Sequence, residues 1–259
     1  MSSKAYSPIT LIAAACIILG AQTKTYAENP APVLSPNDRK AIVKLLGPDV
    51  VGDAVPSKPI DDPSTLFPFH NNASSYRFTS GKNVGKRQAE TLTRVERPGG
   101  RAAWRLEMTP SLVGFVKQTT DGDIVMSAVA DTGEGALVVT EPANPFLPKG
   151  MKPGETRSYS QQVSVRYLDD LSNECYSGIL KSDYTYVGTF RVKVPAGTFD
   201  AVLMRSRVDG KIGPAHTRGT SYSLFAPGIG LIAMILQQKI TAFWIYNVDG
   251  AGGKILLSK

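Results

Sequence analysis

Hydrophobic and polar residues alternate along most of the chain, from about residue 75 to its end. Trp104, Leu106 and Met108, for example, are separated from one another by single residues. A period of two is that of a β-strand with one buried face. The strands that this pattern predicts cover residues 103–108, 112–118, 124–130, 137–139, 159–167, 184–194, 199–208, 217–225, 230–237 and 240–246.

Turn-forming residues separate these runs. Asp121-Gly122 lies between two of them and is a strong hairpin signal. Further turns are expected at Ala196-Gly197, Asp209-Gly210 and Pro227-Gly228, and a flexible loop is expected at residues 250–254. About a dozen strands in mostly antiparallel order predict a mainly β fold. The expected architecture is a large antiparallel twisted sheet or an open half-barrel, with one short N-terminal helix.

The predicted helix begins at Ser35-Pro36, where a hydroxyl can cap free amides and a proline ring suits the first turn. Asp38 complements the helix dipole in that turn. The apolar stripe of the helix consists of Ala41, Ile42, Leu45 and Leu46. Residues 49–70 contain four prolines and are expected to form a linker or an extended wrap over the β domain.

The first 27 residues are expected to be a secretory signal peptide. Lys4 precedes an uncharged apolar run at residues 9–21. This run is shorter than the roughly 20 residues that a membrane-spanning helix needs. Small residues in Thr25-Tyr26-Ala27 place the expected cleavage before Glu28. The protein is therefore expected to be periplasmic or secreted, and not an integral membrane protein after cleavage.

Two alternatives stay open for this segment. It could be an N-terminal anchor that is never cut, or Cys16 could be lipidated. The residues before Cys16 lack the Leu-like residue of a lipidation signal, and the apolar run continues past it. The predicted organisation is a signal peptide at residues 1–27, a helical leader and proline-rich wrap at 28–70, and a single β-rich domain at 71–259.

Charge and cysteine content narrow the possible functions. The chain has 29 Lys and Arg residues against 22 Asp and Glu residues, a formal net charge of +7. This excess is spread along the chain, whereas nucleic-acid binding calls for a dense basic patch, so no nucleic-acid partner is expected. Cleavage of the signal peptide would leave Cys175 as the single cysteine, and an internal disulfide is then impossible.

Motifs that carry chemistry are largely missing from the sequence. It contains neither a Gly-x-x-x-x-Gly-Lys-Ser/Thr phosphate loop nor a Gly-x-Ser-x-Gly nucleophile elbow. His70 and His216 lie far apart without clustered ligands, so no metal site is predicted. Cys175 with His216 could form a nucleophile pair, but the neighbouring Glu174 would raise the pKa of the thiol. We therefore expect no catalytic residue, no metal and no cofactor.

Two pairs of carboxylates support an alternative. Asp121 and Asp123 flank a predicted turn, and Asp169 and Asp170 are neighbours in the chain. Two carboxyls that face one bond can hydrolyse a glycoside, so a carboxylate-dependent hydrolase of an envelope polymer is possible in principle. Turns of this kind are commonly rich in Asp for backbone reasons, which favours a structural interpretation.

Residues 82–105 carry seven Lys and Arg residues against two Glu residues, on one predicted hairpin. A solvated outer face of the sheet explains this bias most simply. The functional interpretation is electrostatic contact with anionic headgroups or cell-wall polymers.

Large apolar side chains fall on the predicted strands and would mostly form a core. A sheet that curves without closing could instead leave an apolar concavity for a lipid or another small hydrophobic ligand. The pattern alone does not separate these two interpretations. The residues concerned are Trp104, Met108, Phe115, Met126, Phe190, Phe199, Phe225, Met234, Phe243 and Trp244.

Three segments carry a family resemblance. Residues 194–201 read V-P-A-G-T-F-D-A, residues 222–231 read Y-S-L-F-A-P-G-I-G-L, and residues 145–156 begin P-F-L-P and end P-G-E-T. Together they resemble a broad group of exported bacterial β-rich proteins with a domain of unknown function. The resemblance implies an envelope domain, some of whose relatives are compared with lipoprotein-carrier half-barrels. It implies no catalytic residue, because proline and glycine at these positions serve hairpins.

The sequence as a whole favours a non-enzymatic periplasmic or secreted β-rich protein. Its expected partner is a lipid or other apolar small molecule, or a component of the cell envelope. The alternatives are the carboxylate-dependent hydrolase and an oligomerising structural scaffold that shields its sheet edges with copies of itself.

Overall fold

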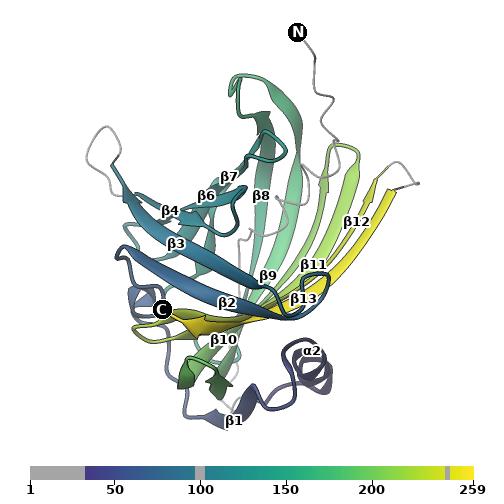
Figure 1. Cartoon of the computed structure of the whole chain (residues 1–259). Helices are drawn as coiled ribbons and strands as arrows, with labels where there is room; N and C mark the ends of the chain where they lie inside the picture. Colours follow the sequence, from purple (N-terminus) through teal and green to yellow (C-terminus); the bar gives the residue numbers. More distant parts are fainter. Residues whose placement is uncertain (1–32, 97–102, 243–245) are drawn as a thin grey trace.

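The computed structural model describes residues 33–96, 103–242 and 246–259. In this part of the chain, Figure 1 shows a β-barrel with the helix α2 packed against its outside. The elements are α2 (Pro36–Leu46), β1 (Val51–Val55), the 3-10 turn η1 (Pro63–Thr65), β2 (Asn72–Ser80), β3 (Arg87–Val95), β4 (Ala103–Glu107), β5 (Leu112–Gln118), β6 (Ile124–Asp131), β7 (Ala136–Leu147), β8 (Thr156–Tyr167), β9 (Glu174–Val194), β10 (Gly197–Ile212), β11 (Ala215–Ala226), β12 (Gly230–Ala242) and β13 (Tyr246–Ser258).

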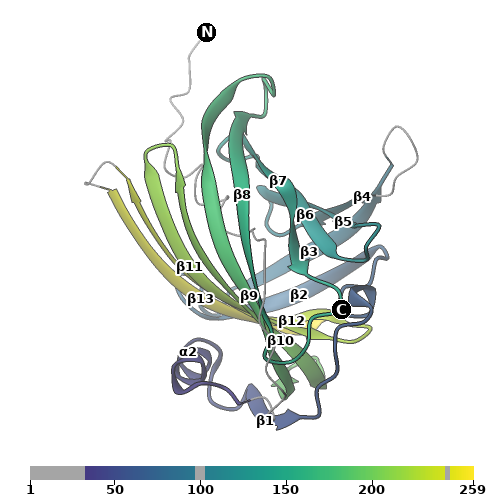
Figure 2. The same cartoon turned by 180° about the vertical axis from the view of Figure 1, so that it is seen from behind.

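Twelve of these strands, β2 to β13, close into a barrel. Each strand pairs in antiparallel fashion with the next one along the chain, and β13 pairs with β2. β9 is long enough to pair with β8 over residues 174–185 and with β1 over residues 189–192. Figure 2 shows the resulting wall from behind, with β1 at the end of the barrel near α2.

The prediction of a mainly β fold with one short helix is confirmed for the described residues, but the expectation of an open sheet or half-barrel was wrong. The ring closes through the pairing of β13 with β2, for example Leu256 with Tyr76. This contact joins segments about 180 residues apart, whereas every other barrel pair is a local hairpin that turn signals can reveal.

Three predictions of element boundaries were also wrong. Asp209-Gly210 lies inside β10 and not in a turn, and residues 250–254 belong to β13 and not to a loop. Glycine is needed at position 210 because a Cβ there would collide with the side chain of Leu180 on β9. The two strands expected at residues 230–237 and 240–246 are largely one strand, β12.

Residues 56–71, here named the wrap segment, lie against one end of the barrel. Ile60 N donates to Met151 O at 2.9 Å, which ties the segment to the β7–β8 connection. Gly228 N donates to Thr65 O at 2.7 Å, which ties it to the β11–β12 connection. These two connections lie at the same end because successive hairpins reverse the direction of the chain.

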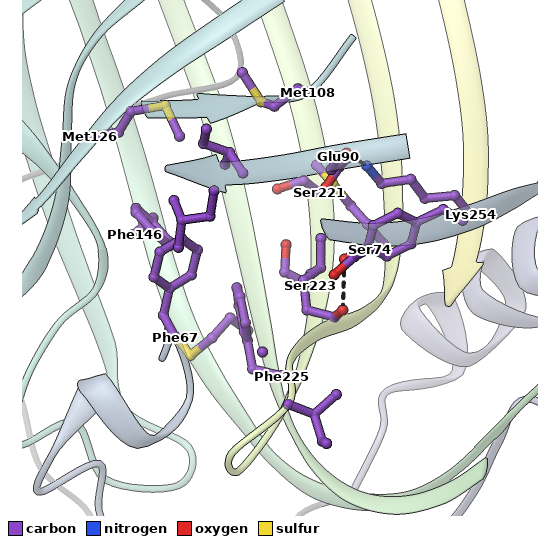
Figure 3. Close-up of a pocket in the computed structure, with 18 of the residues that line it drawn as sticks. Phe67, Ser74, Glu90, Met108, Met126, Phe146, Ser221, Ser223, Phe225 and Lys254 are labelled. Carbon is purple, nitrogen blue, oxygen red and sulfur yellow. Dashed lines mark hydrogen bonds and ion pairs between the residues drawn. The ribbon is translucent and has the colours of Figure 1, made fainter. Parts of the chain in front are cut away.

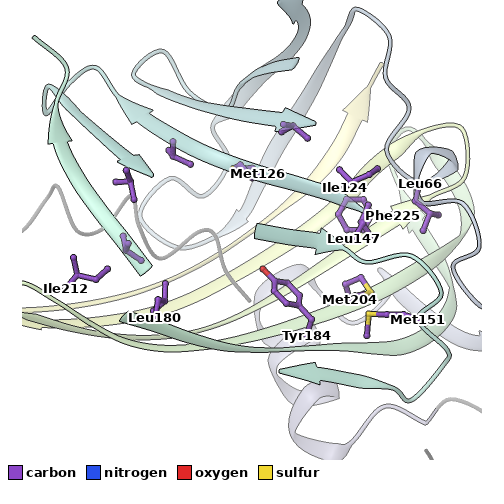
Figure 4. Packing of buried hydrophobic residues seen from close by; sticks show 14 of the residues in the cluster. Leu66, Ile124, Met126, Leu147, Met151, Leu180, Tyr184, Met204, Ile212 and Phe225 are labelled. Carbon is purple, nitrogen blue, oxygen red and sulfur yellow. The ribbon is translucent and has the colours of Figure 1, made fainter. Parts of the chain in front are cut away.

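Buried apolar side chains form two cores, one inside the barrel and one on its outer face. The inner core includes Ile124, Leu147, Leu180 and Tyr184, and the wrap segment adds Leu66 to it; Figure 4 shows this packing. The outer core lies under α2 and includes Phe190, Leu203 and Ile235 from the strands and Ile42, Leu45 and Leu46 from the helix.

The helix α2 begins where the sequence predicts. Ser35 Oγ accepts a hydrogen bond from Asp38 N at 3.1 Å and donates one to Asp38 Oδ2 at 2.8 Å. Asp38 is buried and also accepts from Arg205 Nη1 and Tyr222 Oη, both at 2.7 Å. The first turn of the helix is therefore anchored to β10 and β11. None of the helices in residues 33–96, 103–242 and 246–259 has the length and apolar character that a membrane crossing needs.

Candidate functional site

The barrel encloses a cavity of about 140 Å³ beside the wrap segment. Its wall is formed by residues of β2 to β4, β6, β7 and β9 to β13, together with Phe67 and Pro68 of the wrap segment. Ile229 and Gly230 of the β11–β12 connection also line it. The cavity is thus a product of barrel closure, because segments from both halves of the chain must meet to form its wall.

One side of the cavity is apolar. Four of the six methionines in the chain line it, and so do three phenylalanines. Figure 3 shows Met126, Phe67, Phe146 and Phe225 grouped on this side. The ring of Phe146 lies edge-on to Phe67 with centroids 5.5 Å apart, and 6.4 Å from that of Phe225. The cavity residues in question are Met108, Met126, Met204, Met234, Phe67, Phe146 and Phe225.

The opposite side carries a buried ion pair. Lys254 Nζ of β13 donates to Glu90 Oε1 of β3, and the two side chains are only 12% and 7% exposed. Gln88 Nε2 donates to the same carboxylate oxygen at 2.8 Å. Figure 3 shows Glu90, Lys254 and Ser74 together, across the cavity from Phe146. The pair leaves this wall polar but without net charge.

Tyr76 lies beneath the ion pair, with its ring centroid 4.7 Å from Lys254 Nζ. Its hydroxyl donates to Leu231 O at 2.9 Å. Burial and the negative charge of Glu90 raise the pKa of Tyr76 far above its usual value of 10.0, although a hydrogen bond with Ser74 works in the other direction. Tyr76 therefore stays neutral at physiological pH, and its hydroxyl ties β2 to the backbone of β12.

Asn144 of β7 also lines the cavity and is only 1% exposed. Tyr184 Oη donates to its side-chain oxygen at 3.4 Å. Its side-chain nitrogen Nδ2 has no hydrogen-bond partner within the described part of the chain. Buried donors of this kind are rare in folded proteins and call for an explanation.

A second hollow of about 810 Å³ lies in the half of the barrel away from the wrap segment, and charged residues form part of its lining. Its charged residues are Lys181, Asp183, Arg207, Asp209, Arg218, Lys239 and Asp249. The pKa of Asp209 is lowered, chiefly by its hydrogen bond with His216 at 2.8 Å; burial opposes this, and the hydrogen bond with Arg218 at 2.7 Å adds to the lowering. A general acid needs a raised pKa, so Asp209 is not suited to that role.

The four carboxylates of the hydrolase alternative do not gather in one cleft. Asp121 and Asp123 lie at the β5–β6 turn, whereas Asp169 and Asp170 lie at the β8–β9 turn, at the other end of the barrel. Asp123 Oδ1 accepts from Lys149 N at 2.7 Å, and Asp170 Oδ1 accepts from Ser172 N at 3.1 Å. Neither hollow has any of the four in its lining.

The predicted histidine and cysteine positions are also separate. His216 lies on β11 beside Asp209, and His70 lies in the wrap segment. Cys175 lies at the start of β9 and interacts with Tyr167 across the β8–β9 hairpin. In residues 33–96, 103–242 and 246–259, His, Cys, Asp and Glu side chains form no group of three that could hold a metal ion.

The sequence interpretation of the apolar side chains was partly right. Met108, Met126, Phe225 and Met234 line the cavity, and Trp104 packs against the inner core. Phe190 and Phe199 belong to the outer core, and Phe243 and Trp244 lie outside the described residues. The pattern could not reveal the Glu90–Lys254 pair or Asn144, because their partners are distant in sequence. Lys254 lies in a segment that was predicted as a loop, and Glu90 in a hairpin that was interpreted as a solvated outer face, so neither was expected inside the barrel.

The residues behind the family resemblance serve as hairpin elements. Pro195 and Ala196 connect β9 to β10, and the ring of Phe199 lies over Gly197. Gly230 begins β12 with a φ of 95°, close to Pro68 of the wrap segment. Glycine suits this position because a positive φ strains other residues.

Comparison with known proteins identifies no family for this chain. No family model matches the sequence, and no curated protein matches it. The chain is similar to a candidate exported protein with a YmcC-like fold from Bacteroides fragilis at 12% identity, over 72% of this chain and 93% of that one, with a TM-score of 0.35. A candidate lipoprotein from Parabacteroides distasonis is 14% identical over 80% and 99% of the two chains, with a TM-score of 0.36. Both TM-scores are too low to transfer a function.

Proposed function

We propose that the protein is an exported, non-enzymatic binding protein that holds a small hydrophobic molecule inside its barrel. The observation that carries this proposal is the cavity beside the wrap segment, with four methionines and three phenylalanines in its lining. Apolar pockets with a few convergent polar groups are the usual form of small-molecule sites. Export rests on the expected signal peptide at residues 1–27, which lie outside the described residues.

The size and lining of the cavity suit a compact apolar group. Its volume of about 140 Å³ is close to the roughly 150 Å³ of an engineered apolar cavity that binds benzene. Methionine side chains are flexible and polarisable, so they can repack around guests of different shape. An aromatic ring or a short stretch of an acyl chain therefore fits without rearrangement of the backbone.

Calorimetric titration of the purified protein with toluene tests this proposal. Toluene should bind the wild type and raise its melting temperature, because a ligand that binds only the folded state stabilises it. The variant Ser223→Phe places a ring into the cavity from β11 and should abolish binding. Ser177→Phe, at an exposed position of β9 that lines neither of the two hollows described above, is the matched control and should bind as the wild type does.

Two results would contradict the proposal. The first is the absence of any heat or stabilisation when toluene is added to the wild type. The second is equal binding by the Ser223→Phe variant and the wild type, which would place toluene elsewhere on the molecule. Circular dichroism would verify that both variants retain the β-sheet signal of the wild type.

A further inference from the structure

We infer that the ligand of the cavity carries an uncharged hydrogen-bond acceptor, such as the carbonyl oxygen of a ketone or ester, and that Asn144 Nδ2 binds it. This inference rests on the proposed function and adds the chemical class of the ligand. The observation behind it is the unpartnered amide nitrogen of a residue that lines the cavity and is 1% exposed.

The side chain of Asn144 is held in place from one side only. Its oxygen accepts from Tyr184 Oη at 3.4 Å, and this hydrogen bond restrains the orientation of the amide group. The nitrogen can only donate hydrogen bonds. A buried donor without a partner costs free energy in the folded state, and a ligand oxygen that accepts from it would recover that cost.

The neighbours of Asn144 on the cavity side of β6 and β7 are apolar. Asn144 is paired in register with Met126 on β6, and Phe146 follows two residues later on the same face of β7. Both of these neighbours are apolar cavity residues and offer no strong acceptor. A ligand oxygen that enters the cavity would supply the acceptor that these two neighbours lack.

The charges around the cavity favour a neutral ligand. Its ionised lining residues are Glu90, Lys254 and Lys259. Glu90 and Lys254 neutralise each other in a buried pair, and Lys259 is exposed. The remaining charge, on Lys259, is exposed to solvent and screened by it, so a charged ligand would lose its hydration without gaining a buried, unpaired counter-charge.

Titration of the wild type with ring compounds of similar size tests the inference. Acetophenone, which has a carbonyl acceptor, should bind about threefold to tenfold more tightly than toluene, as one neutral hydrogen bond allows. Benzoate and benzylamine, which are charged, should bind more weakly than acetophenone. Methyl octanoate is a straight-chain ester with a carbonyl acceptor. Tighter binding of methyl octanoate than of acetophenone would indicate a lipid-like ligand, and weaker binding would indicate a ring ketone.

Two variants separate the role of Asn144 from general effects on the cavity. Asn144→Leu should remove the preference for acetophenone over toluene while toluene still binds. Asn72→Leu is the matched control, since Asn72 lines the same cavity but its Nδ2 already donates to His70 O at 3.1 Å. It should leave the preference unchanged. If Asn144→Leu does not fold, the inference is tested by the wild type alone, through its affinity for acetophenone relative to toluene.

The outcomes distinguish this inference from the proposed function. Equal affinity of the wild type for acetophenone and toluene would overturn the inference but not the proposed function, and so would tighter binding of benzoate or benzylamine. A preference that survives in Asn144→Leu would overturn it as well. The absence of binding by every probe would overturn both.

Discussion

Glu90 and Lys254 occupy a position that usually belongs to apolar residues, inside the barrel between β3 and β13. Removal of an ionic partner from a buried pair leaves an uncompensated charge in a poorly hydrated place. The two side chains also join the strands β2–β3 to β13, so they lie next to the seam at which the barrel closes. Their contribution is therefore expected to exceed that of the surface ion pairs.

The variant Glu90→Gln should lower the free energy of unfolding by about 3–5 kcal/mol, because Lys254 would remain buried without its counter-charge. Urea denaturation followed by circular dichroism measures this change. Glu107→Gln, which removes the carboxylate of the exposed pair with Arg105, is the matched control and should cost at most about 1 kcal/mol. Equal effects of the two substitutions would contradict a special role for the buried pair.

Asp38 is the residue through which stability should respond to acid. Burial by itself would raise the pKa of its carboxyl, but hydrogen bonds from Tyr222 and Ser35 and the charge of Arg205 outweigh this effect. The pKa of Asp38 is therefore lowered from its usual value of 3.8. The ionised carboxylate stabilises the folded state above that value, and this contribution is lost as the pH falls below it towards the pKa of the folded state.

Denaturation of the wild type and Asp38→Asn between pH 6 and pH 2.5 tests this assignment. The wild type should lose stability below about pH 4, and the variant should lack this part of the pH dependence. At pH 7 the variant should be less stable by about 3 kcal/mol, since Arg205 would lose its partner. Asp200→Asn, in an exposed pair with Arg191, should change little. An unchanged acid response in Asp38→Asn would contradict the account.

At the scale of elements, α2 is seated on the barrel by backbone contact as well as by its apolar stripe. The carbonyl oxygen of Leu45, in the last turn of the helix, accepts from Thr79 Oγ1 at 2.6 Å and from Ser80 Oγ at 2.7 Å. Gly253 lies directly beneath this carbonyl, where a Cβ would collide with it. The absence of a side chain on β13 thus permits the close approach of the helix.

Gly253→Ala should displace the C-terminal end of α2 and lower the free energy of unfolding by about 1–3 kcal/mol, as overpacking of a core does. The helix should also become more sensitive to proteolysis at residues 36–46. Gly252→Ala is the neighbouring control, since a Cβ there would lie 3.5 Å from its nearest contact, Ser80 O. Similar losses in the two variants would show that glycine 253 has no role in seating the helix.

Local elements were the most predictable part of this protein. The cap at Ser35, the helix after it and most of the strands follow from patterns within a few residues. The turn expected at Asp209-Gly210 was wrong because glycine there serves a close approach of Leu180 to β10, not a reversal of the chain. Asn144 was not predicted as a site residue, because an asparagine between prolines 142 and 145 resembles any polar turn residue.

At the scale of the whole molecule, closure is the property that the sequence did not predict. Turn residues indicate several of the eleven hairpin connections, but the pairing of β13 with β2 joins the two ends of the β domain. Such a pairing leaves no local signal. The pairing of β13 with β2 also completes the cavity, since the cavity wall contains both Glu90 and Leu92 of β3 and Lys254 of β13.

The most direct test of the central claim uses the methionine methyl groups as reporters of the cavity. In protein labelled with ¹³C at these methyls, toluene should shift the resonances of Met108, Met126, Met204 and Met234, which line the cavity. Met151 is an internal control, because it is fully buried in the inner core but does not line the cavity. Shifts confined to the four cavity methionines are the predicted result. Unchanged resonances at saturating toluene would contradict a binding site inside the barrel.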